Sequence, residues 1–149
     1  MIKLFLFLSA TGLIISCNNQ DQNTKGGGKS TKNDLVDCYR YINNNDTIVL
    51  KTIKVGDAIT GILVYKLYQK EENEGTILGR MNGDLLVANY TFFSEGVQQG
   101  VRQVAFKRSG NDFIEGSGET EQKPDRVVFK DLGSLSFNNS MILSGIDCK

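Results

Sequence analysis

The residue types that could do chemistry in this chain are arginine and the carboxylates, because the sequence contains no histidine. Without imidazole, nucleophilic sites of the Ser-His or Cys-His type and His-ligated metal sites are excluded. The sequence also has no phosphate-binding glycine loop that follows a strand and no Asp-x-Asp-x-Asp-Gly calcium loop. We therefore expect a protein that is not an enzyme and that uses no cofactor and no metal.

Arg102 is the side chain most informative about binding. The predicted strand register places it on the apolar face of a sheet, opposite Phe92 and close to Tyr90. A buried charge needs a partner, and Glu95 in the adjoining loop is the nearest candidate. Arg102 either pairs with Glu95 at the rim or anchors the anionic group of a ligand inside the fold. Tyr90 and Phe92 then belong to the core or line that ligand.

Acidic residues gather in the loops at the same predicted end of the fold. They outnumber the basic residues Lys70, Lys123 and Arg126 in those loops. Such a pattern is typical of a solvated loop surface, and the functional alternatives are a site for a cation or a basic partner and, third, a hydrolytic carboxylate pair. The acids are Glu71, Glu72, Glu74, Glu95, Glu119, Glu121 and Asp125.

Four β-strands in direct succession, from Gly75 to Gly118, would position these residues. Asn82-Gly83 between two apolar runs is a strong hairpin signal, because a type I′ turn needs positive φ at both central residues. We expect Tyr90 to pair with Val104 on the next strand. Since strand side chains alternate between faces, one register then accounts for the apolar face of the whole meander.

The last turn of this meander is predicted to contain three residues, Ser109-Gly110-Asn111. A turn of that length sets Phe106 opposite Ile114 and turns Ile114 toward the apolar face. The same register places Glu115 on the opposite, more polar face.

Alternating and β-branched runs predict further strands on both sides of the meander. With eight or nine strands in sequential order, we expect an all-β, antiparallel up-and-down meander that forms a small calycin-like barrel, with a two-sheet β-sandwich as the alternative. Longer loops at residues 68–74, 94–100 and 119–126 share one end, which is the predicted mouth. The further strands are 35–42, 47–55, 58–67, 127–130 and 141–146, with 135–137 as an additional candidate.

The N-terminal residues read as an export signal. One positive charge, Lys3, precedes an apolar run that is too short to span a bilayer. Ile14-Ile15-Ser16-Cys17 resembles the bacterial lipobox, which implies cleavage before Cys17 and acylation of its thiol. We expect a signal peptide at 1–16, the lipidated Cys17 with a disordered tether at 17–34, and a single barrel-like domain at 35–149.

This organisation predicts a membrane link through the acyl chains alone. Loss of Lys3 takes the net charge from 0 to −1, so there is no basic excess for nucleic acid or for anionic lipid. Asn18, rather than Asp, follows the cysteine, which favours the outer over the inner membrane of the cell envelope. The pattern leaves periplasmic and surface display both open.

The cysteine count supports export. Three cysteines are present, and acylation of Cys17 leaves Cys38 and Cys148. An oxidising compartment favours a disulfide between them, and two separate buried thiols are the alternative.

Four segments of the mature chain resemble a recurring pattern in small uncharacterised lipoproteins of Bacteroidota. They are Tyr68 to Gly75, Gly83-Asp84, Ser94-Glu95-Gly96 and Arg102 to Phe106. The resemblance implies location and fold and no activity. We expect a lipid-anchored envelope protein that binds a small ligand or a protein; the alternative is an envelope inhibitor or assembly factor that acts through the acidic loop rim.

Overall fold

Ten β-strands and one short 3₁₀ helix make up the part of the chain that the computed structural model describes, residues 36–138 and 141–149. These residues belong to the compact unit Lys32–Lys149. The predicted signal peptide, Cys17 and the tether lie outside the described residues. The elements are β1 (Val36–Asn43), β2 (Asp46–Val55), β3 (Ala58–Lys66), β4 (Asn73–Asn82), β5 (Leu85–Ser94), β6 (Val97–Ser109), β7 (Asp112–Glu115), β8 (Thr120–Gln122), β9 (Val127–Phe129), η1 (Leu132–Ser134) and β10 (Ile142–Ile146).

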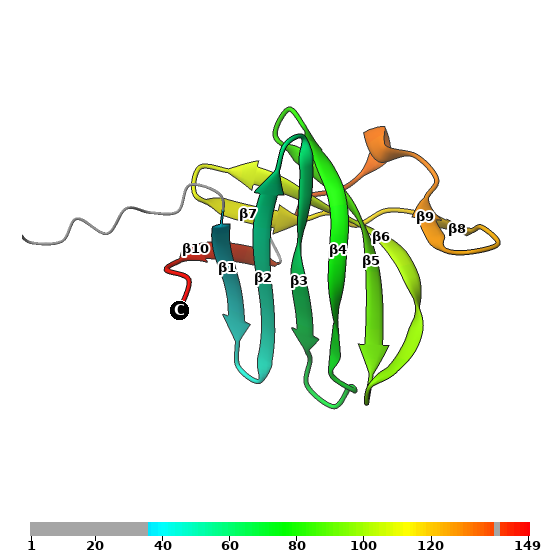
Figure 1. Cartoon of the computed structure of the whole chain (residues 1–149), viewed down its shortest axis with the longest axis horizontal. Coiled ribbons are helices and arrows are strands. Elements are labelled where there is room, and N and C mark those ends of the chain that lie inside the picture. Colours follow the sequence, from blue (N-terminus) through cyan, green and yellow to red (C-terminus); the bar gives the residue numbers. More distant parts are fainter. Residues whose placement is uncertain (1–35, 139–140) are drawn as a thin grey trace, which may run out of the picture. The chain divides into compact units, whose positions relative to one another are not determined.

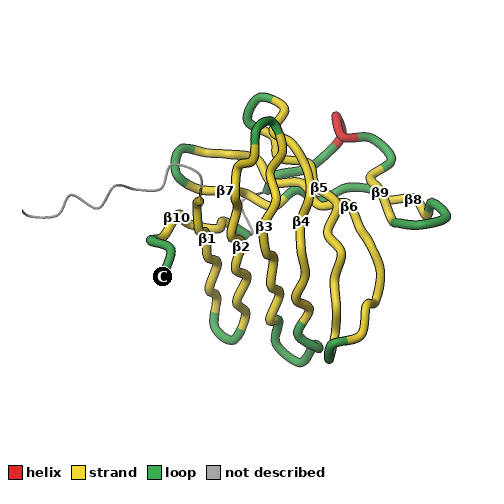
Figure 2. Tube along the Cα trace, in the orientation of Figure 1, coloured by secondary structure: helices red, strands yellow, loops and turns green. Residues whose placement is uncertain are grey.

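The strands close into an antiparallel up-and-down barrel, as predicted. Strands β1 to β7 pair in chain order, and β10 enters between β7 and β1 (Figure 1). The β5–β6 pairing completes the ring, so the barrel has no free edge at that point. The fold is therefore the calycin-like barrel and not the sandwich. Figure 2 shows that almost all of the ring is strand, with short connections.

The connections between consecutive strands lie at the two ends of the barrel. At the short-turn end, two-residue turns begin at Gly56, Gly83 and Gly110, each of which has φ near +60°. At the long-loop end lie the turn after β1, the loop between β3 and β4, and the turn between β5 and β6. The loop predicted at residues 94–100 is wrong: Glu95 (φ 49°) and Gly96 (φ 78°) form a two-residue turn, and β6 begins at Val97.

The structure corrects the predicted register at two positions. Tyr90 pairs with Arg102 rather than with Val104, a shift of two residues that leaves every side chain on its predicted face. The turn between β6 and β7 has two residues rather than three, so Phe106 pairs with Glu115. That one-residue slip turns Glu115 into the barrel, and the prediction that it faces outward is wrong.

The barrel interior is filled at mid-height by one apolar core. Alternation along each strand sends every second side chain inward, as Ile48 and Leu50 of β2 show with 0% exposure. All eight barrel strands contribute. The remaining buried members are Tyr39, Leu63, Tyr65, Ile77, Leu86, Ala88, Tyr90, Val104, Phe106, Phe113 and Leu143.

The segment between β7 and β10 leaves the ring and covers the outer face of β6. The amide of Gly116 donates to the carbonyl of Ala105 (2.9 Å), and Ala105 is fully buried although it faces outward. The β8–β9 hairpin, which projects at the right in Figure 1, joins β6 through a parallel bridge. The predicted strand at 135–137 is reduced to an isolated bridge between Ser117 and Ser136.

A disulfide joins Cys38 and Cys148, with the two Cα atoms 5.3 Å apart. This confirms the predicted pairing of the two cysteines. Cys38 lies on β1, and Cys148 follows β10, its neighbour in the ring. The bond therefore ties together the first and the last strand of the described chain, which are neighbours in the ring.

Candidate functional site

At the long-loop end, Arg102 reaches into the barrel among three aromatic rings. Its Cζ atom lies 5.0 Å from the ring centroid of Tyr65, 5.4 Å from Tyr90 and 5.6 Å from Phe92. The rings of Tyr90 and Phe92 are stacked at 5.4 Å. A guanidinium over aromatic faces is stabilised by the ring quadrupoles. The predicted trio of Arg102, Tyr90 and Phe92 is thus brought together, with Tyr65 as an unpredicted fourth member.

Glu115 supplies the acidic group nearest this cluster. Its Oε1 accepts a 2.6 Å hydrogen bond from the hydroxyl of Tyr65. Burial raises the pKa of Glu115, while the Tyr65 hydrogen bond and the charge of Arg102 oppose that rise. Glu115 and Arg102 make no ion pair within 4.0 Å, and Glu115 Oε2 and Arg102 Nε are both buried without a hydrogen-bond partner.

The two tyrosines stay protonated at ordinary pH. Burial raises the pKa of Tyr90 to about 12, and its hydroxyl donates to the carbonyl of Asn73 (3.1 Å). Burial, followed by the neighbouring Glu115 charge, raises the pKa of Tyr65. Both hydroxyls therefore act as hydrogen-bond donors inside the barrel.

The predicted acidic residues lie outside the barrel and not beside Arg102. Glu95 is exposed in its turn and forms no ion pair with Arg102. Glu71 accepts a 2.8 Å hydrogen bond from Ser94 Oγ, and Glu72 lies 3.5 Å from Lys66 Nζ. Together with Glu74 and the outward side chains of β3 and β5, they line an external groove of about 620 Å³.

A larger cavity, of about 660 Å³, occupies the barrel interior at the short-turn end. Its floor is apolar, and Leu86 and Phe113 in it are almost completely buried. Ile59 and Met81 line it at a higher level and are only partly buried. This interior cavity lies at the short-turn end and not at the long-loop end, which the sequence predicted as the mouth.

Charged side chains surround this cavity. Lys54 and Arg108 occupy the last inward positions of β2 and β6, and Asp37 has the matching position on β1. Arg80 and Asp57 complete the lining at the rim. None of these five described side chains forms an ion pair within 4.0 Å. The lining therefore holds three cations and two anions that are free to meet a ligand.

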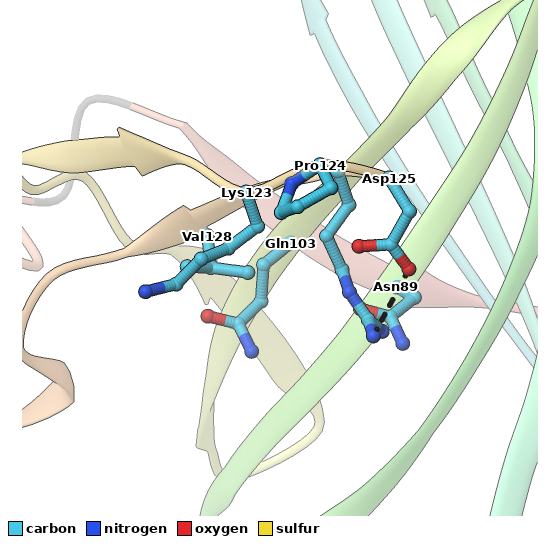
Figure 3. A pocket seen from close by; sticks show the side chains of 7 residues that line it. Asn89, Gln103, Lys123, Pro124, Asp125 and Val128 are labelled. Carbon is cyan, nitrogen blue, oxygen red and sulfur yellow. Dashed lines mark ion pairs between the residues drawn. The ribbon is translucent and has the colours of Figure 1, made fainter.

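A third hollow, of about 510 Å³, lies outside the barrel between the β8–β9 hairpin and the β5–β6 sheet. Figure 3 shows Asn89 and Gln103 of the sheet on one side and Lys123, Pro124 and Asp125 of the hairpin on the other. Gln103 Oε1 already accepts from the amide of Phe129 (3.2 Å), and Arg126 is paired with Asp125 (3.2 Å). The Gln103–Phe129 hydrogen bond attaches the hairpin to the sheet, and the Arg126–Asp125 ion pair lies within the hairpin.

Sequence reasoning missed Lys54, Arg108, Phe113 and Glu115. Lys54 and Arg108 could have been found from the sequence. Each lies two residues after an inward-facing residue, Thr52 or Phe106, so the alternation of strand side chains directs it into the barrel. For Phe113 and Glu115, the face depended on whether the preceding turn has two or three residues. That turn length was the source of the error.

Residues 36–138 and 141–149 contain no group of three or more His, Cys, Asp or Glu side chains arranged to hold a metal ion. The same residues include no helical segment with the length and hydropathy of a membrane span.

Comparison with known proteins gives no match for this chain among protein-family models, curated proteins or solved structures.

Proposed function

We propose that this chain is a lipid-anchored protein of the bacterial cell envelope that binds a small molecule inside its barrel and does no chemistry on it. The observation that carries the proposal is the interior cavity of about 660 Å³. Ligand pockets typically measure about 300–1,000 Å³ and combine an apolar lining with a few polar groups. The cavity lies in that size range, and it combines an apolar floor of Leu86 and Phe113 with charged side chains at the rim.

Two further observations support the envelope part of the proposal. The sequence before Cys17 reads as a lipoprotein signal, and the Cys38–Cys148 disulfide is typical of an oxidising compartment. The described chain enters β1 at Val36, beside the cavity residue Asp37. The cavity would therefore lie at the end of the barrel that leads to the anchor.

Binding can be tested with N-phenyl-1-naphthylamine, a neutral apolar dye whose emission rises in apolar surroundings. The soluble domain, residues 34–149, should bind the dye. Ile59→Trp fills the cavity and should weaken binding at least tenfold, whereas Ile62→Trp, on the outer face of the same strand, should not. Met81→Trp provides a second cavity-filling variant, and circular dichroism verifies that each variant folds. Dye binding that is absent, or equal in all variants, would refute the proposal.

A second candidate function is recognition of a basic protein partner, as in an envelope inhibitor or assembly factor. The supporting observation is the external groove, where Glu71, Glu72 and Glu74 lie beside the exposed apolar side chains of Ile62 and Phe93. A partner in this groove would protect residues 71–76 and 93–96 from amide hydrogen exchange. Protection confined to the barrel's other end would argue against it.

A further inference from the structure

We propose that the cavity ligand is an amphiphile with an apolar body and one anionic head group, and that Lys54 and Arg108 bind the head. This inference rests on the proposed function, since it names the ligand class for the same cavity. It follows from the arrangement of apolar and charged groups along the depth of the cavity.

The depth of the cavity selects an apolar body. Its floor is formed by Leu86 (0% exposed) and Phe113 (1% exposed), which belong to the apolar core of the barrel. Ile59 and Met81 continue that surface toward the opening. A hydrocarbon or aromatic body that enters this space removes apolar surface from water on both sides of the contact.

The rim selects the charge of the head group. Arg108 is held over the floor, with its Cζ atom 5.1 Å from the ring centroid of Phe113. Lys54 points inward from β2, and both side chains remain exposed and without an ion pair. Ammonium and guanidinium groups form charge-assisted hydrogen bonds with carboxylate, phosphate and sulfate oxygens.

The acids of the rim do not reverse this preference. Asp37 and Asp57 line the same opening, but Lys54, Arg80 and Arg108 outnumber them by one charge. Asp37 is the half-buried member, and Asp57 lies in the turn between β2 and β3. An anionic head group placed between Lys54 and Arg108 is therefore attracted by an excess of positive charge, and a cationic head group is repelled by it.

The test uses three ligands with the same ten-carbon chain: decanoate, 1-decanol and decyltrimethylammonium. Decanoate and decyltrimethylammonium are titrated below their micellar concentrations, and decanol below its solubility limit, against N-phenyl-1-naphthylamine bound to the soluble domain. Decanoate should displace the dye at about a tenfold lower concentration than decanol, and the cation should be the weakest.

The variant pair locates the head-group site. In Lys54→Gln/Arg108→Gln, decanoate should lose its advantage over decanol while decanol still displaces the dye. The matched control is Lys51→Gln/Lys107→Gln, which removes the same charge from the same two strands. Lys51 and Lys107 have the opposite parity along β2 and β6, and neither lines the cavity. The control should keep the preference for decanoate.

The outcomes separate this inference from the proposed function. Equal displacement by all three ligands, or an unchanged decanoate preference in the double variant, would overturn the anionic amphiphile while Ile59→Trp still shows that the cavity binds. Dye binding that is insensitive to Ile59→Trp would overturn both.

Discussion

The hydroxyl of Tyr65 donates a 2.6 Å hydrogen bond to Glu115 Oε1 inside the barrel, between side chains fifty residues apart in the chain. The bond links β3 to β7, two strands that are not neighbours in the sheet. Arg102 stacks on the ring of the same tyrosine at 5.0 Å. One polar cluster thus joins β3, β6 and β7 at the long-loop end, while the opposite end of the interior is hollow.

Replacing Tyr65 by Phe should destabilise the fold. The change removes one donor and leaves a buried carboxylate oxygen unpartnered, which costs about 1–3 kcal/mol. Chemical denaturation of wild type and variant at pH 7 measures the difference. Tyr68→Phe, at a side chain that is 60% exposed, is the control and should leave the stability unchanged. Equal stabilities for Tyr65→Phe and wild type would show that the hydrogen bond makes no net contribution.

Glu115→Gln should flatten the pH dependence of stability. Burial raises the pKa of Glu115 above its ordinary value of 4.5, so the folded state holds this proton more tightly than the unfolded state does. The resulting stabilisation is fully present below the unfolded pKa and is lost as the pH rises through the folded pKa. The amide oxygen of Gln still accepts from Tyr65 but does not titrate.

Melting temperatures measured in steps from pH 3.5 to pH 8 provide the test. The melting temperature of wild type should fall, relative to that of Glu115→Gln, as the pH rises from the unfolded pKa of Glu115 to its folded pKa. Above the folded pKa, the two plots of melting temperature against pH should run parallel. Glu119→Gln, at an exposed ion pair with Lys130, serves as the control and should retain the wild-type decline. A Glu115→Gln curve parallel to wild type throughout would contradict a raised pKa.

Much of the fold could be predicted from the sequence because its determinants are local. Alternating apolar residues and glycine-containing turns placed β2, β3, β4 and β5 within one or two residues of their observed bounds, whereas β6 begins at Val97, inside the loop predicted at 94–100. The β8 strand, Thr120–Gln122, was not predicted, because its three exposed polar residues carry no alternation. Its pairing with β9 is set by the tertiary contact with β6.

The site could be predicted only in part, because it depends on turn length. Arg102 was placed correctly on the inner face, since a shift of two residues preserves the face. Glu115 was assigned to the wrong face, since the turn at Gly110 is one residue shorter than expected. Whether one end of a barrel is filled or hollow depends on side-chain volumes across all eight strands, which no local pattern encodes.

Arg102→Met should extend the pH range over which stability falls. Methionine retains contact with the aromatic rings. The change removes the positive charge that lowers the pKa of Glu115, so that pKa rises further. The decline in melting temperature should then continue to a higher pH than in wild type. Arg126→Met, which removes a charge from the β8–β9 hairpin, is the control. If the melting temperature of Arg102→Met falls over the same pH range as that of wild type, the charge of Arg102 does not influence the pKa of Glu115.

The same variant examines the anchor role predicted for Arg102 from the sequence. The cavity at the short-turn end does not include Arg102 in its lining. Dye and decanoate binding should therefore survive Arg102→Met, provided that the variant folds. Loss of binding in a folded Arg102→Met protein would instead place the ligand at the long-loop end.

Reduction of the Cys38–Cys148 disulfide should weaken the barrel where β1 pairs with β10. The bond spans 110 residues, and a loop of that length corresponds to about 4–5 kcal/mol in the chain-entropy model. The effect should be largest in β10, which joins β1 over Cys38 to Arg40 and β7 over only Phe113 and Ile114. Cys38→Ser/Cys148→Ser should accordingly lower the melting temperature and speed amide exchange in Ile142–Ile146 more than in β3 or β4. Equal amide exchange rates in all strands would mean that the barrel opens as one unit and that β10 is no less stable than the other strands.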